Sequence, residues 1–177
     1  MRFFKGFTLV ELLIALSILG VIVTFTIPKI LSVQQDQTYN AKAKEVAAMV
    51  SAAYQQHQLA GGLTTGSTMM SLSQYINYLS VDTTSAVDTY QTNTTRSCGG
   101  WTCLRLHNGA IMRHNGVPFG STAGGVWFDV DPDGQVTDGT TNGPGKAVQF
   151  ILFYNGRLTT IGVSIDNPTL DPPWFSW

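Results

Sequence analysis

The chain has 177 residues, which allows one ordinary globular domain and one separate helix. Charged residues make up 12% of the chain, and the formal net charge is −1. Nothing in this composition indicates a strongly basic surface of the kind that binds nucleic acid, so we do not expect a nucleic-acid partner.

The first predicted element is a helix that starts in an apolar run over residues 7–27. At about 1.5 Å per residue this run makes a helix of roughly 30 Å, which is enough to cross a bilayer. A secretory signal peptide would have a core of only about 7–15 apolar residues with a small-residue cleavage site after it, and this run has no such site. An ordinary membrane anchor leaves Glu11 unexplained, because a carboxylate in hydrocarbon costs about 3 kcal/mol or more.

Residues 5–11 are KGFTLVE: Lys5 and Gly6 end a basic leader, Phe7 follows, and Glu11 closes a Thr-Leu-x-Glu pattern. In this order the N-terminus resembles that of the type IV prepilin family, which includes the pseudopilins of type II secretion. The resemblance implies that a membrane-embedded prepilin peptidase cuts between Gly6 and Phe7. It also implies that the new amino group of Phe7 is methylated.

Glu11, Gly20 and Pro28 occupy positions that match the family's assembly helix. Physical chemistry supports a role for Glu11 independently. Cleavage would create an ammonium group at Phe7, one helical turn and about 6 Å before Glu11. In a bundle of staggered helices the Glu11 carboxylate can pair instead with the Phe7 amine of a neighbour. Because lipid cannot satisfy a lone carboxylate, this pairing would favour assembly and fix its register.

These features divide the chain into a leader peptide at 1–6, a transmembrane and assembly helix at 7–28, and a globular pilin domain at 29–177 that includes the second half of the helix. The basic leader stays in the cytoplasm by the positive-inside rule. The resemblance implies a single pass through the bacterial cytoplasmic (inner) membrane, followed by assembly into an extracellular filament or a periplasmic pseudopilus. The implied partners are membrane lipid, the prepilin peptidase/methyltransferase, the inner-membrane assembly platform, other pilins and further copies of this chain.

The helical pattern continues beyond Pro28, so we expect a kink there rather than an end. Residues 39–57 place one set of side chains at helical spacing along a single face. They are Tyr39, Ala43, Val46, Val50, Ala53 and His57. Gly61 and Gly62 end the pattern, which predicts one long kinked helix from Phe7 to about Leu59 whose second half packs on the domain core.

Between this helix and the first predicted strand the pattern weakens. Residues 61–68 form a predicted loop. A short amphipathic helix is predicted from the spacing of Met69, Leu72, Tyr75, Ile76 and Leu79. Residues 80–97 are polar and rich in threonine, and we expect a surface excursion with little regular structure. In type IV pilins the region between helix and sheet varies and helps to define the filament's surface, and the resemblance implies the same here.

From residue 101 onward the pattern predicts strands. Two pairs flank Asn-Gly turns, 102–107 with 110–114 and 147–154 with 157–163, which is the strongest short hairpin signal. Residues 126–130 are a fifth candidate. The fold class is therefore α+β: a long kinked N-terminal helix, half transmembrane, packed on a C-terminal antiparallel sheet of about four or five strands, as in the pilin fold.

The tail at 167–177 is rich in aromatic residues, and its prolines prevent it from being a central strand. Trp174, Phe175 and Trp177 either cover an edge of the sheet or lie at a contact between subunits.

Cys98 and Cys103 are the only two cysteines. In the oxidising compartment outside the inner membrane we expect them to form a disulfide, worth roughly 2 kcal/mol because the closed loop is short. A zinc site would recruit His107 or His114, but two cysteines at this spacing leave the fourth ligand undefined. Redox catalysis would need a C-x-x-C motif, which the chain lacks.

Asp129, Asp131 and Asp133, followed by a glycine, match the first half of a calcium-binding EF-hand loop. The bidentate glutamate at the end of such a loop is replaced by Thr140, and Asp138 is the expected substitute. Some pilins and pseudopilins bind calcium in a loop between sheet and tail. The alternative is an acidic turn held by Asx hydrogen bonds. Calcium is the one candidate cofactor.

No nucleophile motif accompanies His57, His107 or His114, and no glycine-rich loop follows a strand and opens a helix, so we expect neither an enzyme nor a nucleotide site. The sequence predicts a structural subunit of a type IV pilus-like filament. A type II secretion pseudopilin fits the same leader and helix. A minor pilin acting as an adhesive or binding module is the third interpretation, favoured by the aromatic tail and the threonine-rich stretch.

Overall fold

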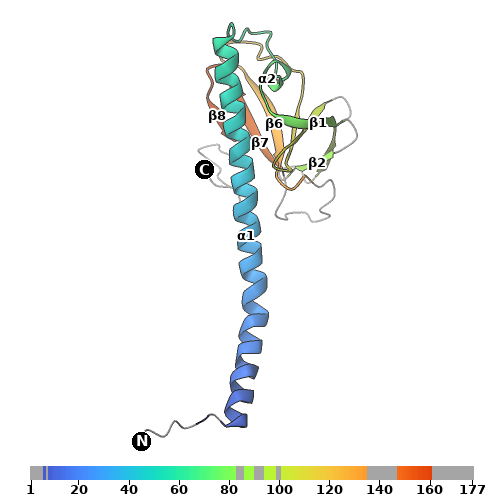
Figure 1. Cartoon of the computed structure of the whole chain (residues 1–177). Coiled ribbons are helices and arrows are strands. Elements are labelled where there is room, and N and C mark those ends of the chain that lie inside the picture. Colours follow the sequence, from blue (N-terminus) through green and yellow to red (C-terminus); the bar gives the residue numbers. More distant parts are fainter. Residues whose placement is uncertain are drawn as a thin grey trace, which may run out of the picture. The chain divides into compact units, whose positions relative to one another are not determined.

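The computed structural model describes residues 6, 8–82, 86–89, 94–98, 101–134 and 147–160, and this part of the chain contains two helices and eight strands (Figure 1). The helices are α1 (Leu9–Leu59) and α2 (Met69–Ser73). The strands are β1 (Tyr78–Asp82), β2 (Ala86–Thr89), β3 (Thr94–Ser97), β4 (Thr102–Leu106), β5 (Ile111–His114), β6 (Gly125–Asp131), β7 (Val148–Phe153) and β8 (Leu158–Thr160).

The long helix predicted from the sequence is confirmed as α1. It ends at Leu59, as expected, and it includes Pro28 without a break. Just beyond its end, the N–H of Gly62 donates to the carbonyl of His57 at 3.1 Å, and Gly62 has a positive φ of 80° that suits glycine. Phe7, the predicted first helical residue, lies outside the described residues, and the kink at Pro28 stays a prediction.

The chain divides into two compact units, Met1–Gln35 and Asp36–Trp177. The first unit holds the beginning of α1. The second unit holds the remainder of α1, together with α2 and all the described strands. The predicted leader at 1–6, assembly helix at 7–28 and globular domain at 29–177 concern processing and membrane insertion, and they stay predictions.

Six strands of the second unit form one antiparallel sheet in the order β1-β4-β5-β6-β7-β8. The α+β fold class is thus confirmed, with one strand more than the upper limit we expected. Both predicted Asn-Gly hairpins form, β4–β5 and β7–β8. The turns contain Gly109 and Gly156, and each of these glycines has a φ of 84°. Tight hairpin turns require such a positive φ, which glycine adopts readily.

Two predictions for residues 79–97 are wrong. The short helix ends at Ser73, and Leu79 belongs instead to the edge strand β1, where it is 62% exposed. β1 forms because it pairs with β4, a long-range contact that helical spacing alone does not reveal. Part of the stretch expected to be irregular forms the two-stranded sheet β2–β3. Threonine favours strands, and the polar composition concealed that preference.

The larger of the two hydrophobic clusters in the described residues joins α1 to one face of the six-stranded sheet, which we call the core face. The predicted stripe of α1 is confirmed at its centre, where Ala43, Val46, Val50 and Ala53 are at most 1% exposed. Alternate residues of the strands supply the other side, as the two-residue period of a strand requires. They are Leu104, Leu106, Met112, Val126, Phe128, Val130, Val148, Phe150 and Leu152.

Candidate functional site

Residues 9–33 of α1 expose apolar side chains all around the helix, each of them between 45% and 75% exposed. They are Leu9, Val10, Leu12, Leu13, Ile14, Leu16, Ile18, Leu19, Val21, Ile22, Val23, Phe25, Ile27, Ile30, Leu31 and Val33. A helix that is apolar all round needs apolar surroundings on every side. In the described part of the chain, α1 is the one helix long and apolar enough to cross a membrane.

Hydroxyl groups within this segment are satisfied by the helix itself. Ser17 Oγ donates to the carbonyl of Leu13 at 2.8 Å, and Thr24 Oγ1 donates to the carbonyl of Gly20 at 2.7 Å. Thr26 makes the same bond four residues back, at 2.8 Å. Because these hydroxyl protons are used inside the helix, the side chains do not need water, and lipid or another apolar helix can surround them.

Glu11 is the one charged residue in the apolar run, and its carboxylate is bonded at the start of α1. Its Oε2 accepts hydrogen bonds from the backbone N–H of Thr8 at 2.7 Å and from Thr8 Oγ1 at 2.9 Å. In return, the Glu11 N–H lies 3.3 Å from Thr8 Oγ1, to which it donates. This reciprocal arrangement is a capping box, which satisfies N–H groups that the first turn of a helix leaves without partners.

Sequence reasoning identified Glu11 but missed Thr8 as its partner. The signal was present, since Thr-x-x-Glu directly before an apolar helix is typical of a capping box. The carboxylate thus has hydrogen-bond partners within its own chain before any neighbouring helix arrives. Its pairing with the amine of Phe7 stays a prediction, because Phe7 lies outside the described residues.

Two predicted glycines of this region have open space around them. Gly6, at the expected cleavage site, is exposed, and a Cβ added to it would meet nothing within 4 Å. A Cβ added to Gly20 would also meet nothing within 4 Å. The packing of this chain therefore requires neither glycine. On an apolar helix a glycine allows a second helix to approach closely, which fits the predicted assembly role of Gly20.

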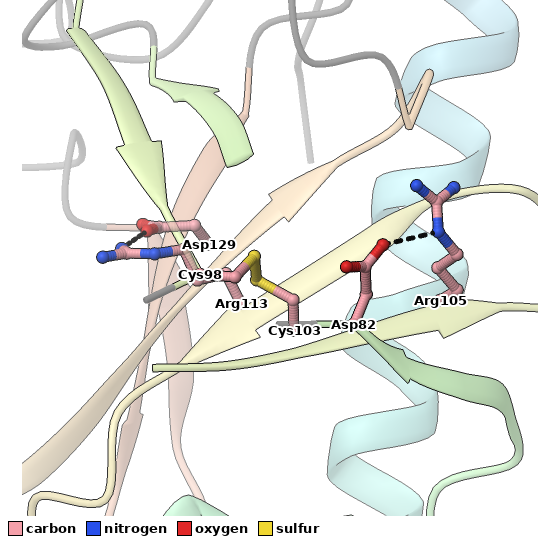
Figure 2. Close-up of a disulfide and its surroundings, with 6 residues drawn as sticks. All are labelled: Asp82, Cys98, Cys103, Arg105, Arg113 and Asp129. Atoms are coloured by element: carbon pink, nitrogen blue, oxygen red, sulfur yellow. Dashed lines mark hydrogen bonds and ion pairs between the residues drawn. A yellow bond between two sulfur atoms is a disulfide. The ribbon is translucent and has the colours of Figure 1, made fainter. Parts of the chain in front are cut away.

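The second group of predicted residues lies on the face of the sheet opposite the core face, which we call the far face. A disulfide joins Cys98 and Cys103, as predicted, with their Cα atoms 5.8 Å apart (Figure 2). Both cysteines are at most 1% exposed and pack with Ile111 and Ala147. Cysteines bind zinc as thiolates, which the two disulfide-bonded cysteines do not provide, so this geometry favours the disulfide interpretation over the metal one.

Arg113 is a buried cation next to the disulfide. Its Nη1 donates to Asp129 Oδ2 at 2.8 Å, and the two side chains are only 4% and 1% exposed (Figure 2). Its guanidinium lies 3.6 Å from the centroid of the Trp101 ring. Strand register produces the cluster, because Cys103, Arg113 and Asp129 are direct neighbours across β4, β5 and β6. Breaking such a buried pair leaves an uncompensated charge, so the cluster has a structural role.

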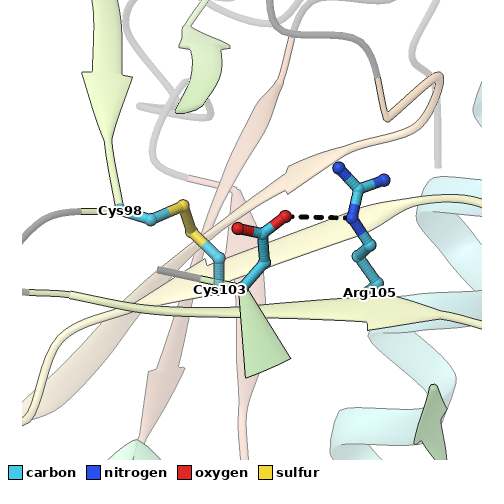
Figure 3. Close-up of polar contacts among 4 residues, drawn as sticks. Cys98, Cys103 and Arg105 are labelled. Atoms are coloured by element: carbon cyan, nitrogen blue, oxygen red, sulfur yellow. Dashed lines mark hydrogen bonds and ion pairs between the residues drawn. A yellow bond between two sulfur atoms is a disulfide. The ribbon is translucent and has the colours of Figure 1, made fainter. Parts of the chain in front are cut away.

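A second ion pair links the edge strand to its neighbour. Arg105 Nε on β4 lies 3.0 Å from Asp82 Oδ2 on β1, with the side chains 41% and 15% exposed (Figure 3). Water screens pairs as exposed as this, and they contribute little to stability. We assign the pair no further role.

The three described aspartates of the predicted calcium loop stand at the end of β6 and have other contacts. Asp129 is in the ion pair described above. Asp131 Oδ1 accepts hydrogen bonds from the N–H groups of Asp133 at 3.3 Å and Gly134 at 3.2 Å, which is the Asx turn considered as the alternative. Asp138 lies outside the described residues. No group of three or more His, Cys, Asp or Glu residues is placed to hold a metal within the described ranges, and calcium binding stays a prediction.

The histidines have contacts of a structural kind. His114 is fully buried, with Nδ1 3.3 Å from the carbonyl of Asn115. Burial lowers the pKa of His114 below its usual 6.5, and the hydrogen bond to Asn115 opposes this only in part. His107 contacts Asn77 Oδ1 at 3.0 Å, and the ring of His57 lies 5.7 Å from that of a tyrosine. None of these contacts places a histidine beside a nucleophile.

Comparison with known proteins bears on the N-terminal segment. Residues 1–27 match the family model described as the prokaryotic N-terminal methylation motif. No curated protein and no solved structure shows significant similarity to the chain. The chain thus carries the class III signal peptide of type IV pilins and pseudopilins, as its sequence predicted. This motif indicates a pilin-like structural subunit rather than an enzyme. It implies membrane anchoring before assembly, processing by a prepilin peptidase and assembly with other pilins.

Proposed function

We propose that this protein, whose first 27 residues carry the N-terminal methylation motif, is a structural subunit of a type IV pilus-like filament. It is made as a prepilin in the cytoplasmic membrane, cut between Gly6 and Phe7, and methylated on the amino group of Phe7. The observation that supports this best is the segment 9–33, which exposes apolar side chains on every side around a single carboxylate, that of Glu11. Such a surface can be covered first by lipid and then by the helices of other subunits.

The capping box at the start of α1 suggests how Glu11 acts in assembly. Before assembly, the hydrogen bonds from Thr8 reduce the cost of holding a carboxylate at the edge of the membrane. Cleavage adds an ammonium group one turn earlier, at Phe7. In the filament, Glu11 pairs with the ammonium group of a neighbouring subunit, and this charge pair in apolar surroundings fixes the stagger between helices.

Two related functions fit the same N-terminus. A type II secretion pseudopilin would use the same leader and helix and assemble into a short periplasmic pseudopilus. A minor pilin acting as an adhesive or binding module would be scarce within the filament. The inner-membrane assembly platform is the expected partner in each case. The abundance of the subunit in surface fibres separates these functions.

The direct test is the intact mass and N-terminal sequence of the protein from sheared surface fibres and from membranes. A chain that begins at N-methylated Phe7 in abundant fibres, two mass units light for the disulfide, supports the pilin proposal. The same processed chain found only in membranes supports the pseudopilin or scarce minor subunit. A chain that still begins at Met1 in cells with an active prepilin peptidase contradicts all three functions.

Replacing the carboxylate tests the assembly step separately. We expect Glu11→Val to be cut, methylated and inserted normally but to yield few or no fibres, because the charge pair that sets the stagger is lost. Glu45→Gln is the matched control, since Glu45 is an exposed acid of the same helix whose Oε2 accepts a bond from Asn108. Normal fibres built from Glu11→Val alone would show that the pairing is dispensable.

Calcium binding at Asp129, Asp131, Asp133 and Asp138 is a secondary proposal that rests on the loop sequence. If the site exists, calcium raises the melting temperature of the purified protein, and the Asp138→Asn variant does not respond, because one ligand is lost. An equal melting temperature with calcium and with a chelator would leave the Asx turn as the whole explanation of this motif.

A further inference from the structure

One part of the far face is closed by the chain itself. Cys103, Arg113 and Asp129 form a row across β4, β5 and β6, and none of them is more than 4% exposed. The disulfide includes one end of this row (Figure 2). The ring of Trp101 lies over the guanidinium of Arg113, the middle residue of the row. Strand β2 also contacts β6. Polar and charged groups on this part of the sheet are therefore shielded from water.

The adjoining part of the far face is open. Trp127, Ile151 and Thr159 form the next row, in register across β6, β7 and β8. Trp127 is 50% exposed, whereas the residues before and after it in β6, Val126 and Phe128, are only 1% exposed. A half-exposed indole on an inner strand leaves a large apolar surface in contact with water.

A hollow of about 310 Å³ lies beside Trp127. Its lining consists of Asn115, Val117, Gly125, Val126 and Trp127. Strand alternation places Gly125 on the far face, where it contributes no side chain to this lining. The lining has no charged residue, and its volume is at the low end of the range of about 300–1,000 Å³ that small-molecule pockets occupy. It suits a single aromatic side chain.

We define the open patch as Trp127, Ile151 and the hollow. The described part of the chain ends close to this patch. β8 ends at Thr160, one residue beyond the row that leads across the sheet to Trp127. Residues 161–177 follow in the sequence and lie outside the described part. Two strand spacings, about 10 Å, separate β8 from β6, whereas a chain of this length can span about 55 Å when extended.

We propose that the aromatic side chains of residues 167–177 dock on the open patch of the same chain. The prolines of this tail prevent it from adding as a regular strand, so side-chain contacts are its means of attachment. Proline-rich segments bind well to exposed aromatic surfaces, and Trp174, Phe175 and Trp177 supply groups that fit the hollow. The tether raises the local concentration of the tail to the millimolar range, which favours the chain's own tail over that of another subunit. This inference rests on the sheet and does not depend on the proposed function.

Cysteine cross-linking in the full-length protein tests the proposal. The pair Val117→Cys and Ser176→Cys places one thiol at the rim of the hollow and one between two tail aromatic residues, and leaves every aromatic residue in place. Leu79→Cys with Ser176→Cys is the matched control, because Leu79 is similarly exposed but lies on the opposite edge strand. We expect the first pair to form a disulfide within one chain at least about tenfold faster than the control pair.

A third variant tests whether the cross-linking depends on the open patch. Adding Trp127→Ala to the first pair should slow its cross-linking by about tenfold, since the indole is the main docking surface. Trp127 is half exposed, so we expect this variant to fold normally. Equal rates for the two cysteine pairs, or no effect of Trp127→Ala, would overturn the proposal. Cross-links found between chains in a mixture of tagged and untagged protein would assign the patch to a second subunit instead.

Discussion

Residues 9–33 and 43–53 belong to the same helix, yet their apolar side chains have opposite environments. The large apolar side chains of the first segment project from all sides of the helix, and each is 45–75% exposed. The second segment has a narrow stripe of smaller residues, and each is at most 3% exposed against the sheet. They are Ala43, Val46, Ala47, Val50 and Ala53.

The difference shows where each segment finds its apolar partner. The stripe of the second segment matches one sheet face, and small side chains allow the helix to lie close to Phe128 and Phe150, whose rings stack at 5.3 Å. The first segment is apolar around its whole circumference, and no single sheet face could cover that surface. Its partners must surround it, as lipid or other helices do. Of these two helix segments, only the second should therefore contribute to the stability of the sheet domain.

The largest expected effect comes from a charge in the stripe. Val50 is fully buried. Val50→Asp should cost the sheet domain more than about 3 kcal/mol, because an unpaired carboxylate would be buried in the core, and we expect the domain to unfold. Near-ultraviolet circular dichroism of the full-length protein in detergent micelles measures this loss.

Val21→Asp is the matched variant in the first segment, where Val21 is 60% exposed. It should leave the melting of the domain unchanged and impair insertion into the membrane, since a carboxylate costs about 3 kcal/mol there. If Val21→Asp destabilised the sheet domain as strongly as Val50→Asp, the two segments would not be independent.

The next effect concerns the buried charges of the far face. Arg113→Met should destabilise the domain by about 3 kcal/mol, because Asp129 would remain buried without its cation. Adding Asp129→Leu should restore most of that stability, since a buried ion pair can be replaced by apolar residues at little cost. Urea unfolding of the single and double variants measures both changes. A double variant as unstable as the single one would argue against this charge-pair explanation.

The smallest effect is a dependence on pH through His114. Because burial lowers its pKa in the folded state, the unfolded chain binds the proton more readily. The contribution of His114 to stability is complete above its unfolded pKa of about 6.5, and it is lost progressively as the pH falls below that value. His114→Phe should flatten this dependence in thermal melts between pH 7 and pH 5. A pH dependence that is unchanged in His114→Phe would contradict this explanation.

Local sequence patterns were sufficient to predict two kinds of element. One is a strand that pairs with a strand close to it in the sequence, and the other is a helix, whose backbone hydrogen bonds are internal. The Asn-Gly turns predicted both hairpins, and the 3.6-residue period predicted α1 to its last residue, Leu59. The same period misplaced Leu79, because its spacing from Met69 fits a helix although the residue lies in β1. That strand pairs with β4, more than twenty residues further along the chain, and only this pairing decides its conformation.

The sequence by itself determined the N-terminal site. The motif can be recognised because its residues lie within one short stretch of the chain: Lys5, Gly6, Phe7 and Glu11. The capping of Glu11 by Thr8 is also a local contact. Tertiary structure alone decided the far face. Trp101 and Asp129 meet at Arg113 only because antiparallel register brings distant strands side by side. The hollow beside Trp127 likewise joins residues that are separate in the sequence, since Asn115 and Val117 line it together with Gly125 and Trp127 of β6. Contacts within one helical turn follow from the order of residues, whereas contacts across a sheet follow from the burial of a shared core.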